Sequence, residues 1–170
     1  MCLDMKRWQE SQTRSASFLL KKKLFLNVDP YIINDERFQC GMTQKYLDRY
    51  SISSGNVIFE ITERTNIEDE DIDIFRDVME HYKEQGYQIA IDDFGKEYSG
   101  VQRILKLNPG YVKIDMELVR NIHSDSVKSK MLEGFVKFCN PLGIKLIAEG
   151  IETKEELAKL FRPFLEKYIP

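Results

Sequence analysis

Five short apolar runs in this chain each end in an acid, an amide or a lysine. They start about thirty residues apart, and most are separated by sequence with helical periodicity. Runs this hydrophobic are typical of strands inside a parallel sheet that is covered on both faces. We therefore predict an α/β fold built from βα units. The runs are Leu24–Val28, Val57–Glu63, Tyr87–Asp93, Tyr111–Asp115 and Ile144–Glu149.

Parallel strands joined by crossover helices form either an open doubly wound sheet or a (β/α) barrel. In an open sheet, function concentrates where the strand order reverses, whereas a barrel draws site residues from the ends of several strands. Every predicted strand here contributes a polar end, which favours the barrel. We predict a partial TIM-like barrel, because about five strands are recognisable and a complete barrel usually needs roughly 250 residues.

Composition bounds the class of protein. The 170 residues, with 42% hydrophobic and 31% charged side chains, are ordinary for one soluble globular domain. A net charge of -3 gives no basic footprint for nucleic acid, so we expect no DNA partner. We find no signal peptide and no membrane-spanning run. Cys2, Cys40 and Cys139 are scattered and odd in number, which indicates a reducing, cytosolic compartment.

Helical patterns follow most of the strands, and Pro163 is expected to end or kink the last helix. Residues 31–50 carry an apolar pattern typical of a helix, and a capping box at Thr65–Glu68 opens a helix that should end at Gly86. A short helix is expected at Val101–Leu105. Ser124 is expected to cap the next helix, and a second capping box at Thr153–Glu156 opens the last one.

The polar residues at the strand ends are interpreted as one site. A buried carboxylate is costly unless it is paired or binds a metal ion. Each of these residues, taken alone, also has a purely structural explanation. Glu60 could form a buried salt bridge with Lys113, and Glu149 could be a helix N-terminal acid. Several independent accidents would be needed to explain the whole set. The set is Asn27, Glu60, Glu63, Asp92, Asp93, Asp115 and Glu149.

The adjacent acids Asp92 and Asp93 are the most informative pair, because neighbouring carboxylates repel unless cations lie between them. Taken alone, the pair could be a turn cap beside a solvated acid. Lys113 alternates with Val112 and Ile114, so we expect it to face the opposite side of its strand. It could be a structural counter-ion, or it could steady an attacking water or a phosphate.

All of the candidate ligands are hard oxygen donors, which suit Mg²⁺ or Mn²⁺ rather than zinc or copper. Two close divalent ions and a lysine are what in-line attack on a phosphodiester requires. An unrelated Mg²⁺-dependent barrel enzyme that uses Lys113 as a base stays open as an alternative.

Ordered motifs over roughly residues 20–155 carry a more specific signal. They are Leu26–Pro30, Glu60–Glu63, Asp92–Gly95, Lys113–Asp115 and Ala148–Thr153. In this order and spacing they resemble the EAL family, the cyclic di-GMP phosphodiesterases of bacterial signalling. The resemblance implies a modified TIM barrel, a bacterial cytoplasmic location and cleavage of cyclic di-GMP to linear pGpG.

The resemblance also implies a two-ion site. Asn27, Glu60 and Asp92 would ligate one metal ion. Asp92 would bridge to a second ion, and Asp93 would be the other carboxylate on that ion.

The remaining motif residues are implied to serve catalysis or to support the site. Lys113 and Glu149 would hold or deprotonate the water. Glu63 would fix the loop after the third strand, and Asp115 and Glu152 would support the site.

The chain departs from the family pattern in three places. It has no Glu-Ala-Leu, the motif whose glutamate ligates metal, and we find no C-terminal strand with a Gln-Gly pair. Residues 95–100 read Gly-Lys-Glu-Tyr-Ser-Gly, where the family reads close to Gly-Thr-Gly-Tyr-Ser-Ser. We expect residues 1–170 to be a single EAL-like domain that lacks the N-terminal strand with Glu-Ala-Leu and the C-terminal strand with Gln-Gly.

Two expectations follow from these departures. The two-ion site should be impaired, and hydrolysis of cyclic di-GMP should be weak or absent. The alternative to a phosphodiesterase is a non-catalytic module that binds cyclic di-GMP or a protein. An incomplete barrel exposes its first and last strands, so the strand at residues 24–28 or the one at 144–148 should be covered by the terminal helices or by a second chain, as in a homodimer.

Overall fold

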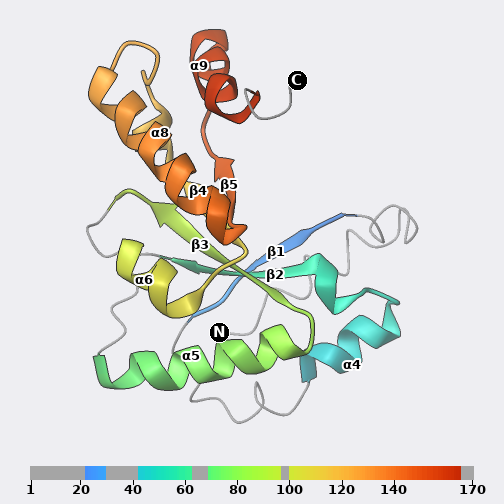
Figure 1. The fold of residues 1–170 in the computed structure, drawn as a ribbon. Helices are drawn as coiled ribbons and strands as arrows, with labels where there is room; N and C mark the ends of the chain where they lie inside the picture. The colour runs from blue at the N-terminus through green and yellow to red at the C-terminus, as the bar shows by residue number, and fades with distance from the viewer. Residues whose placement is uncertain (1–21, 30–41, 63–68, 97–99, 166–170) are drawn as a thin grey trace.

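A five-stranded parallel sheet forms the centre of the computed structural model, which describes residues 22–29, 42–62, 69–96 and 100–165 (Figure 1). The strands follow one another in the order β1-β2-β3-β4-β5. Each coincides closely with a predicted run, so the five predicted strands are confirmed. They are β1 (Leu24–Asn27), β2 (Val57–Thr62), β3 (Gln88–Phe94), β4 (Tyr111–Ile114) and β5 (Lys145–Ala148).

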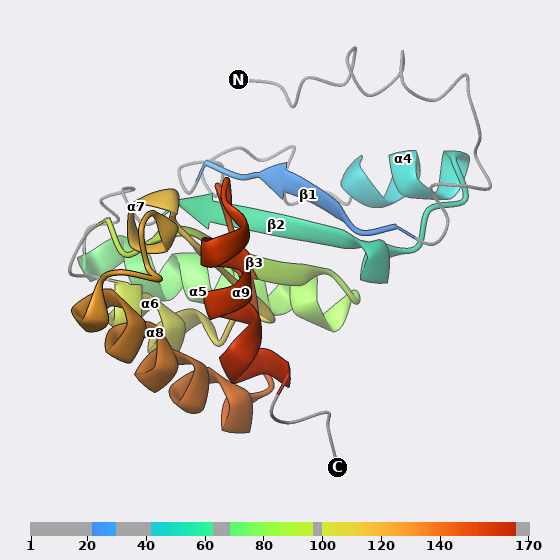
Figure 2. The same cartoon turned by 90° about the horizontal axis from the view of Figure 1, so that it is seen from above.

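Helices alternate with the strands, as βα units require. In the described part of the chain, α5, α6 and α8 pack against one face of the sheet (Figures 1 and 2). The helices are α4 (Met42–Arg49), α5 (Asp69–Glu84), α6 (Gly100–Leu107), α7 (Met116–Val119), α8 (Ser126–Cys139) and α9 (Lys154–Leu165), with short 3-10 turns η3 (Ser54–Asn56) and η4 (Asn140–Leu142).

Side chains on both faces of the central strands β2, β3 and β4 are buried, which explains why these strands read as nearly continuous apolar runs. Phe59, Ile91 and Val112 belong to the large core beneath the helices. The opposite face carries a smaller cluster in which Tyr111 packs edge-on against Phe25, with the ring centroids 5.7 Å apart. The charged residues at the strand ends continue this second face.

The order of the strands distinguishes the two predicted architectures. An open doubly wound sheet reverses its strand order at a switch point, whereas the strands of a barrel wall follow one another around it. The described strands run from β1 to β5 without reversal. This arrangement is that of part of a barrel wall.

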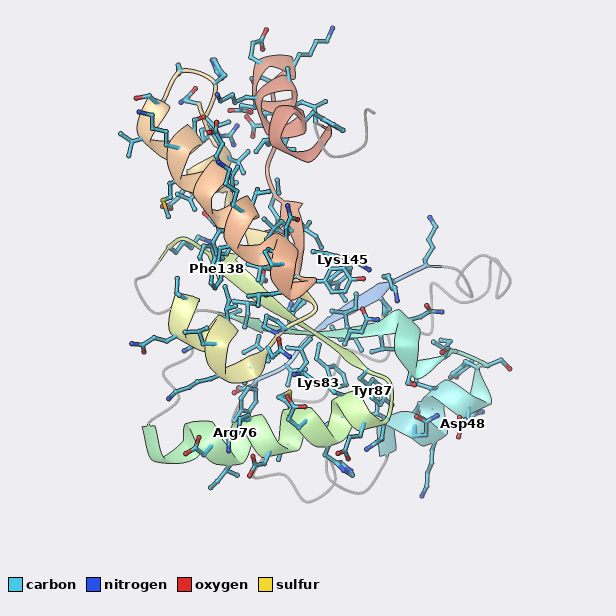
Figure 3. All side chains as sticks on the ribbon, viewed as in Figure 1. Asp48, Arg76, Lys83, Tyr87, Phe138 and Lys145 are labelled. Carbon is cyan, nitrogen blue, oxygen red and sulfur yellow. The ribbon has the colours of Figure 1, made fainter. Side chains whose placement is uncertain are left out.

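Polar contacts fix the helices against one another at their ends. Lys83, near the end of α5, donates to the Leu107 carbonyl at the end of α6 over 2.6 Å (Figure 3). The Tyr87 hydroxyl, just before β3, donates to Gln44 of α4 over 3.2 Å. These contacts hold the helical layer at the end of the sheet opposite the charged residues.

One helix prediction was wrong in detail. Asp125, and not Ser124, caps α8, because its carboxylate accepts from the N–H groups of Val127 and Lys128 at 2.9 and 3.0 Å. Pro163 was expected to end or kink the last helix, and α9 ends two residues after it, at Leu165. The capping box predicted at Thr65–Glu68 lies outside the described residues.

The described helices include none that is both long and apolar enough to cross a membrane.

Candidate active site

Three carboxylates from different strands converge on the ammonium group of Lys113. Its Nζ lies 2.8 Å from Glu60 Oε1 on β2, 2.9 Å from Asp92 Oδ1 on β3 and 2.8 Å from Glu149 Oε1 after β5. The side chains of Glu60 and Lys113 are only 8% and 14% exposed, whereas that of Glu149 is 36% exposed. The cluster therefore has a buried side at β2 and a more open side at Glu149.

Strand alternation places Lys113 in this cluster. Val112 and Ile114, its neighbours on β4, are buried in the large core. Lys113 faces the other side of the sheet, as its alternation with these two residues predicted. The sequence also suggested Glu60 as its salt-bridge partner, and the structure forms that pair.

Lys113 is held in its protonated form. Burial lowers the pKa of Lys113, but the bonds to Glu149, Glu60 and Asp92 outweigh burial and hold its pKa above the ordinary value. A lysine that stays protonated donates hydrogen bonds and cannot act as a general base. This geometry counts against the alternative in which Lys113 is the base.

A bulge near the end of β3 supplies the two adjacent acids. The register between β3 and β4 shifts between Ile91 and Phe94, and Asp93 has a left-handed φ of 59°. The Asp93 N–H donates to Asp92 Oδ1 over 3.0 Å. Phe94 returns to the core, where its ring stacks on Phe135 with centroids 4.2 Å apart. Both acids therefore stay at the strand end without displacing the core.

Asp93 and Asp115 form a second ion cluster with Lys96. Lys96 Nζ lies 2.6 Å from Asp93 Oδ1 and 2.7 Å from Asp115 Oδ2. The buried Asp115 also caps α7 by accepting from the Glu117 N–H over 2.8 Å. Burial raises the pKa of Asp115, but the bonds from Lys96 and Glu117 outweigh burial and leave it below the ordinary value. The altered loop is visible in the sequence, but its spacing did not predict that Lys96 lies in the site.

The loop after Glu149 is fixed by a residue that the sequence had singled out only as part of a capping box. Glu156, 1% exposed, accepts from the N–H groups of Asn121, Glu152 and Thr153 at 2.9, 3.0 and 3.1 Å. These bonds lower the pKa of Glu156 to about 2. Glu152 itself is exposed and forms a two-pronged ion pair with Arg120. Its side chain lies outside both lysine clusters.

The remaining predicted site residues are placed only in part. Asn27 is the last residue of β1, lies beside Glu60 in the strand register and is exposed. Glu63 lies outside the described residues.

The donor chemistry of the Lys113 cluster fits a hard divalent ion. Asn27, Glu60, Asp92 and Glu149 offer amide and carboxylate oxygens, the ligand types that Mg²⁺ and Mn²⁺ prefer. Three carboxylates around one ammonium leave an excess of negative charge. Within the described ranges, however, no three acid, histidine or cysteine side chains are arranged around a common metal position. The carboxylates are directed at the lysine instead.

Comparison with known proteins decides the family. A sequence model of the EAL domain matches residues 1–162. The chain belongs to the EAL domain family. The resemblance inferred from the motifs is therefore confirmed. Among curated proteins, this EAL chain is 32% identical over 133 residues to the cyclic di-GMP phosphodiesterase PdeF of Escherichia coli K12. The match covers 76% of this chain and 17% of PdeF, so the chain spans less than a quarter of that relative.

Solved EAL structures share the fold. A standalone EAL protein from Vibrio cholerae O395, in a c-di-GMP-bound form, superposes with a TM-score of 0.76 at 34% identity, covering 87% of this chain and 62% of that one. BlrP1 of Klebsiella pneumoniae, in a complex with manganese and cyclic di-GMP, superposes with a TM-score of 0.76 at 28% identity. The match covers 95% of this chain and 43% of that one. The predicted partial TIM-like barrel is confirmed.

Proposed function

We propose that this EAL chain binds cyclic di-GMP at the carboxyl ends of its strands and is built to hydrolyse it to pGpG with Mg²⁺ or Mn²⁺. The observation that carries the proposal is the convergence of Glu60, Asp92 and Glu149 on Lys113. PdeF is named as a cyclic di-GMP phosphodiesterase, and the Vibrio and Klebsiella structures contain the nucleotide. These relatives support the choice of substrate.

The metal would be held by Asn27, Glu60 and Asp92, and would polarise the phosphate and the attacking water. Lys113, kept protonated, donates to the water or to a phosphate oxygen. Glu149, the most exposed carboxylate of the cluster, accepts a proton from the water. The new bond joins the water oxygen to phosphorus, the bond to the ribose 3′ oxygen breaks, and that oxygen takes a proton from solvent to become a hydroxyl. The product is linear pGpG with a 5′ phosphate.

We expect turnover by these 170 residues to be weak or absent. They contain no Glu-Ala-Leu, and Asp93 is already bound to Lys96. The same contact favours a second candidate function, a non-catalytic module that binds cyclic di-GMP or a protein partner.

A calorimetric titration with cyclic di-GMP in Mn²⁺ tests the proposal. We expect saturable binding that Asp92→Asn weakens roughly tenfold or more, because it removes one of the site carboxylates. The control is Asp77→Asn on α5, where the lost charge is exposed and pairs with Arg76. Absence of binding, or equal loss in both variants, would contradict the proposal. Chromatography of the same samples for pGpG separates turnover from binding alone.

Two further proposals concern location and assembly. The free, buried Cys139 supports a reducing, cytoplasmic compartment.

In the described part of the sheet, β1 pairs with β2 alone and β5 with β4 alone. We propose that a second copy of the chain covers one of these edges, because unpaired strand edges invite association. Sedimentation measurements that find only a monomer would contradict that proposal.

A further inference from the structure

A tight turn brings Lys96 back onto the strand that precedes it. Gly95 has a left-handed φ of 108°, and the Lys96 N–H donates to the Asp93 carbonyl over 3.3 Å. A Cβ atom at Gly95 would lie 2.1 Å from a methyl carbon of Leu118, so the turn also packs tightly on α7. The turn therefore places Lys96, three residues after Asp93, close to the Asp93 carboxylate.

The ammonium group of Lys96 joins two carboxylates from different parts of the chain. It lies 2.6 Å from Asp93 Oδ1 and 2.7 Å from Asp115 Oδ2, and its side chain is 19% exposed. The other oxygen of Asp115 accepts from Glu117, so both oxygens of that carboxylate are already bonded. Lys96 thus performs the task that an added cation would perform between these acids.

The two lysine clusters differ in net charge. Lys113 has three carboxylate partners, which leave two negative charges in excess and suit one divalent ion. Lys96 has two carboxylate partners, which leave only one negative charge in excess. A divalent ion at Asp93 must therefore compete with a positive charge that is already bound at short range.

We infer that Lys96 is a built-in cation that replaces a divalent ion at Asp93 and limits the chain to one tightly held metal ion. This inference rests on the proposed function, because it concerns the metal site of the same reaction. Lys96 acts as a positioning residue through Asp93. Removal of its charge restores two negative charges to the pair of acids and lets them bind a divalent ion.

Manganese binding, counted by electron paramagnetic resonance, tests the inference without reference to turnover. The wild-type chain should bind one Mn²⁺ ion, and Lys96→Met, which is one atom shorter but unbranched and uncharged, should bind a second. Lys96→Arg should behave like the wild type. Lys96→Met combined with Asp93→Asn should lose the second ion again. The matched control is Lys137→Met, an exposed lysine on α8.

Thermal unfolding provides a second readout if Lys96→Met is unstable. Two carboxylates without their shared cation should lower its midpoint in buffer, and Mn²⁺ should raise that midpoint more than it raises that of the wild type. Equal Mn²⁺ counts and equal midpoint shifts in the two proteins would overturn the inference and leave the proposed function intact. No bound Mn²⁺ in either protein, together with no binding of cyclic di-GMP, would overturn both.

Discussion

Asp92 and Asp93 are adjacent in sequence, yet their carboxylates bind different lysines. Asp92 contacts Lys113 at 2.9 Å, and Asp93 contacts Lys96 at 2.6 Å. The bulge and the left-handed conformation of Asp93 make this division possible. Two charge clusters therefore lie next to each other at the end of β3, each neutralised in part by its own ammonium group.

Replacement of Lys113 by methionine should destabilise the fold. The substitution leaves the buried Glu60 and the partly buried Asp92 without a cation, and loss of one partner of such a cluster costs about 3 kcal/mol. The free energy of unfolding in urea measures the loss. Mn²⁺ should recover part of it, because the freed carboxylates become metal ligands.

Lys145→Met is the matched control for that variant. Lys145 lies on β5 with its ammonium 5.3 Å from the centre of the Tyr111 ring (Figure 3). Loss of this exposed contact should cost about 0.5–1 kcal/mol. Equal losses for the two lysines would contradict the buried cluster around Lys113.

Glu156→Gln should remove an acid-sensitive part of the stability. The N–H groups of Asn121 and Glu152 lower the pKa of Glu156 to about 2 in the folded chain, below its ordinary value of 4.5. A lowered pKa contributes stability that is complete above about pH 4.5 and is lost as the pH falls toward 2. Glutamine has a single carbonyl oxygen, so it cannot accept all three bonds.

Thermal midpoints between pH 3 and pH 7 measure this effect. Glu155→Gln removes the same charge from the same helix turn, but its side chain is exposed, so it should change the profile little. Parallel pH profiles for Glu156→Gln and the wild type would show that Glu156 does not support the loop.

Gly150→Ala should destabilise the loop that carries Glu149. Gly150 has a φ of 66°, and an added Cβ would lie 2.6 Å from the Cβ of Met116. The left-handed conformation alone costs an alanine roughly 1–2 kcal/mol, and the contact adds to that loss. Gly134→Ala is the control, because Gly134 lies in α8 with open space around it and alanine should stabilise the helix by about 0.5–1 kcal/mol. Denaturation in urea that gives both variants the same sign would contradict this account.

The sequence predicted the strands and suggested the Glu60–Lys113 pair, because simple alternation of buried and polar residues controls both. Val112, Lys113 and Ile114 alternate on β4, so the position of the charge follows from the burial of its neighbours. The convergence of Glu60 and Lys113 follows from parallel strands whose carboxyl ends share one side of the sheet.

The second cluster could not be predicted in the same way. Lys96 reaches Asp93 because Gly95 adopts a left-handed turn, and Asp115 joins them from the start of α7, just after β4. Glu156 was recognised as half of a capping box, but its bond to Asn121 joins segments 35 residues apart. Such contacts depend on tertiary packing, which spacing along the chain does not encode.

Turnover of cyclic di-GMP tests the central claim most directly. The measurement is chromatographic detection of pGpG in excess Mn²⁺, with Glu149→Ala as the control for contaminating activity. The wild-type chain should form little or no pGpG, Lys96→Met should form more than the wild type, and Glu149→Ala should form none. Rapid turnover by the wild type that Glu149→Ala abolishes would contradict the account, because Lys96 would then not hold the site in a weakly active state.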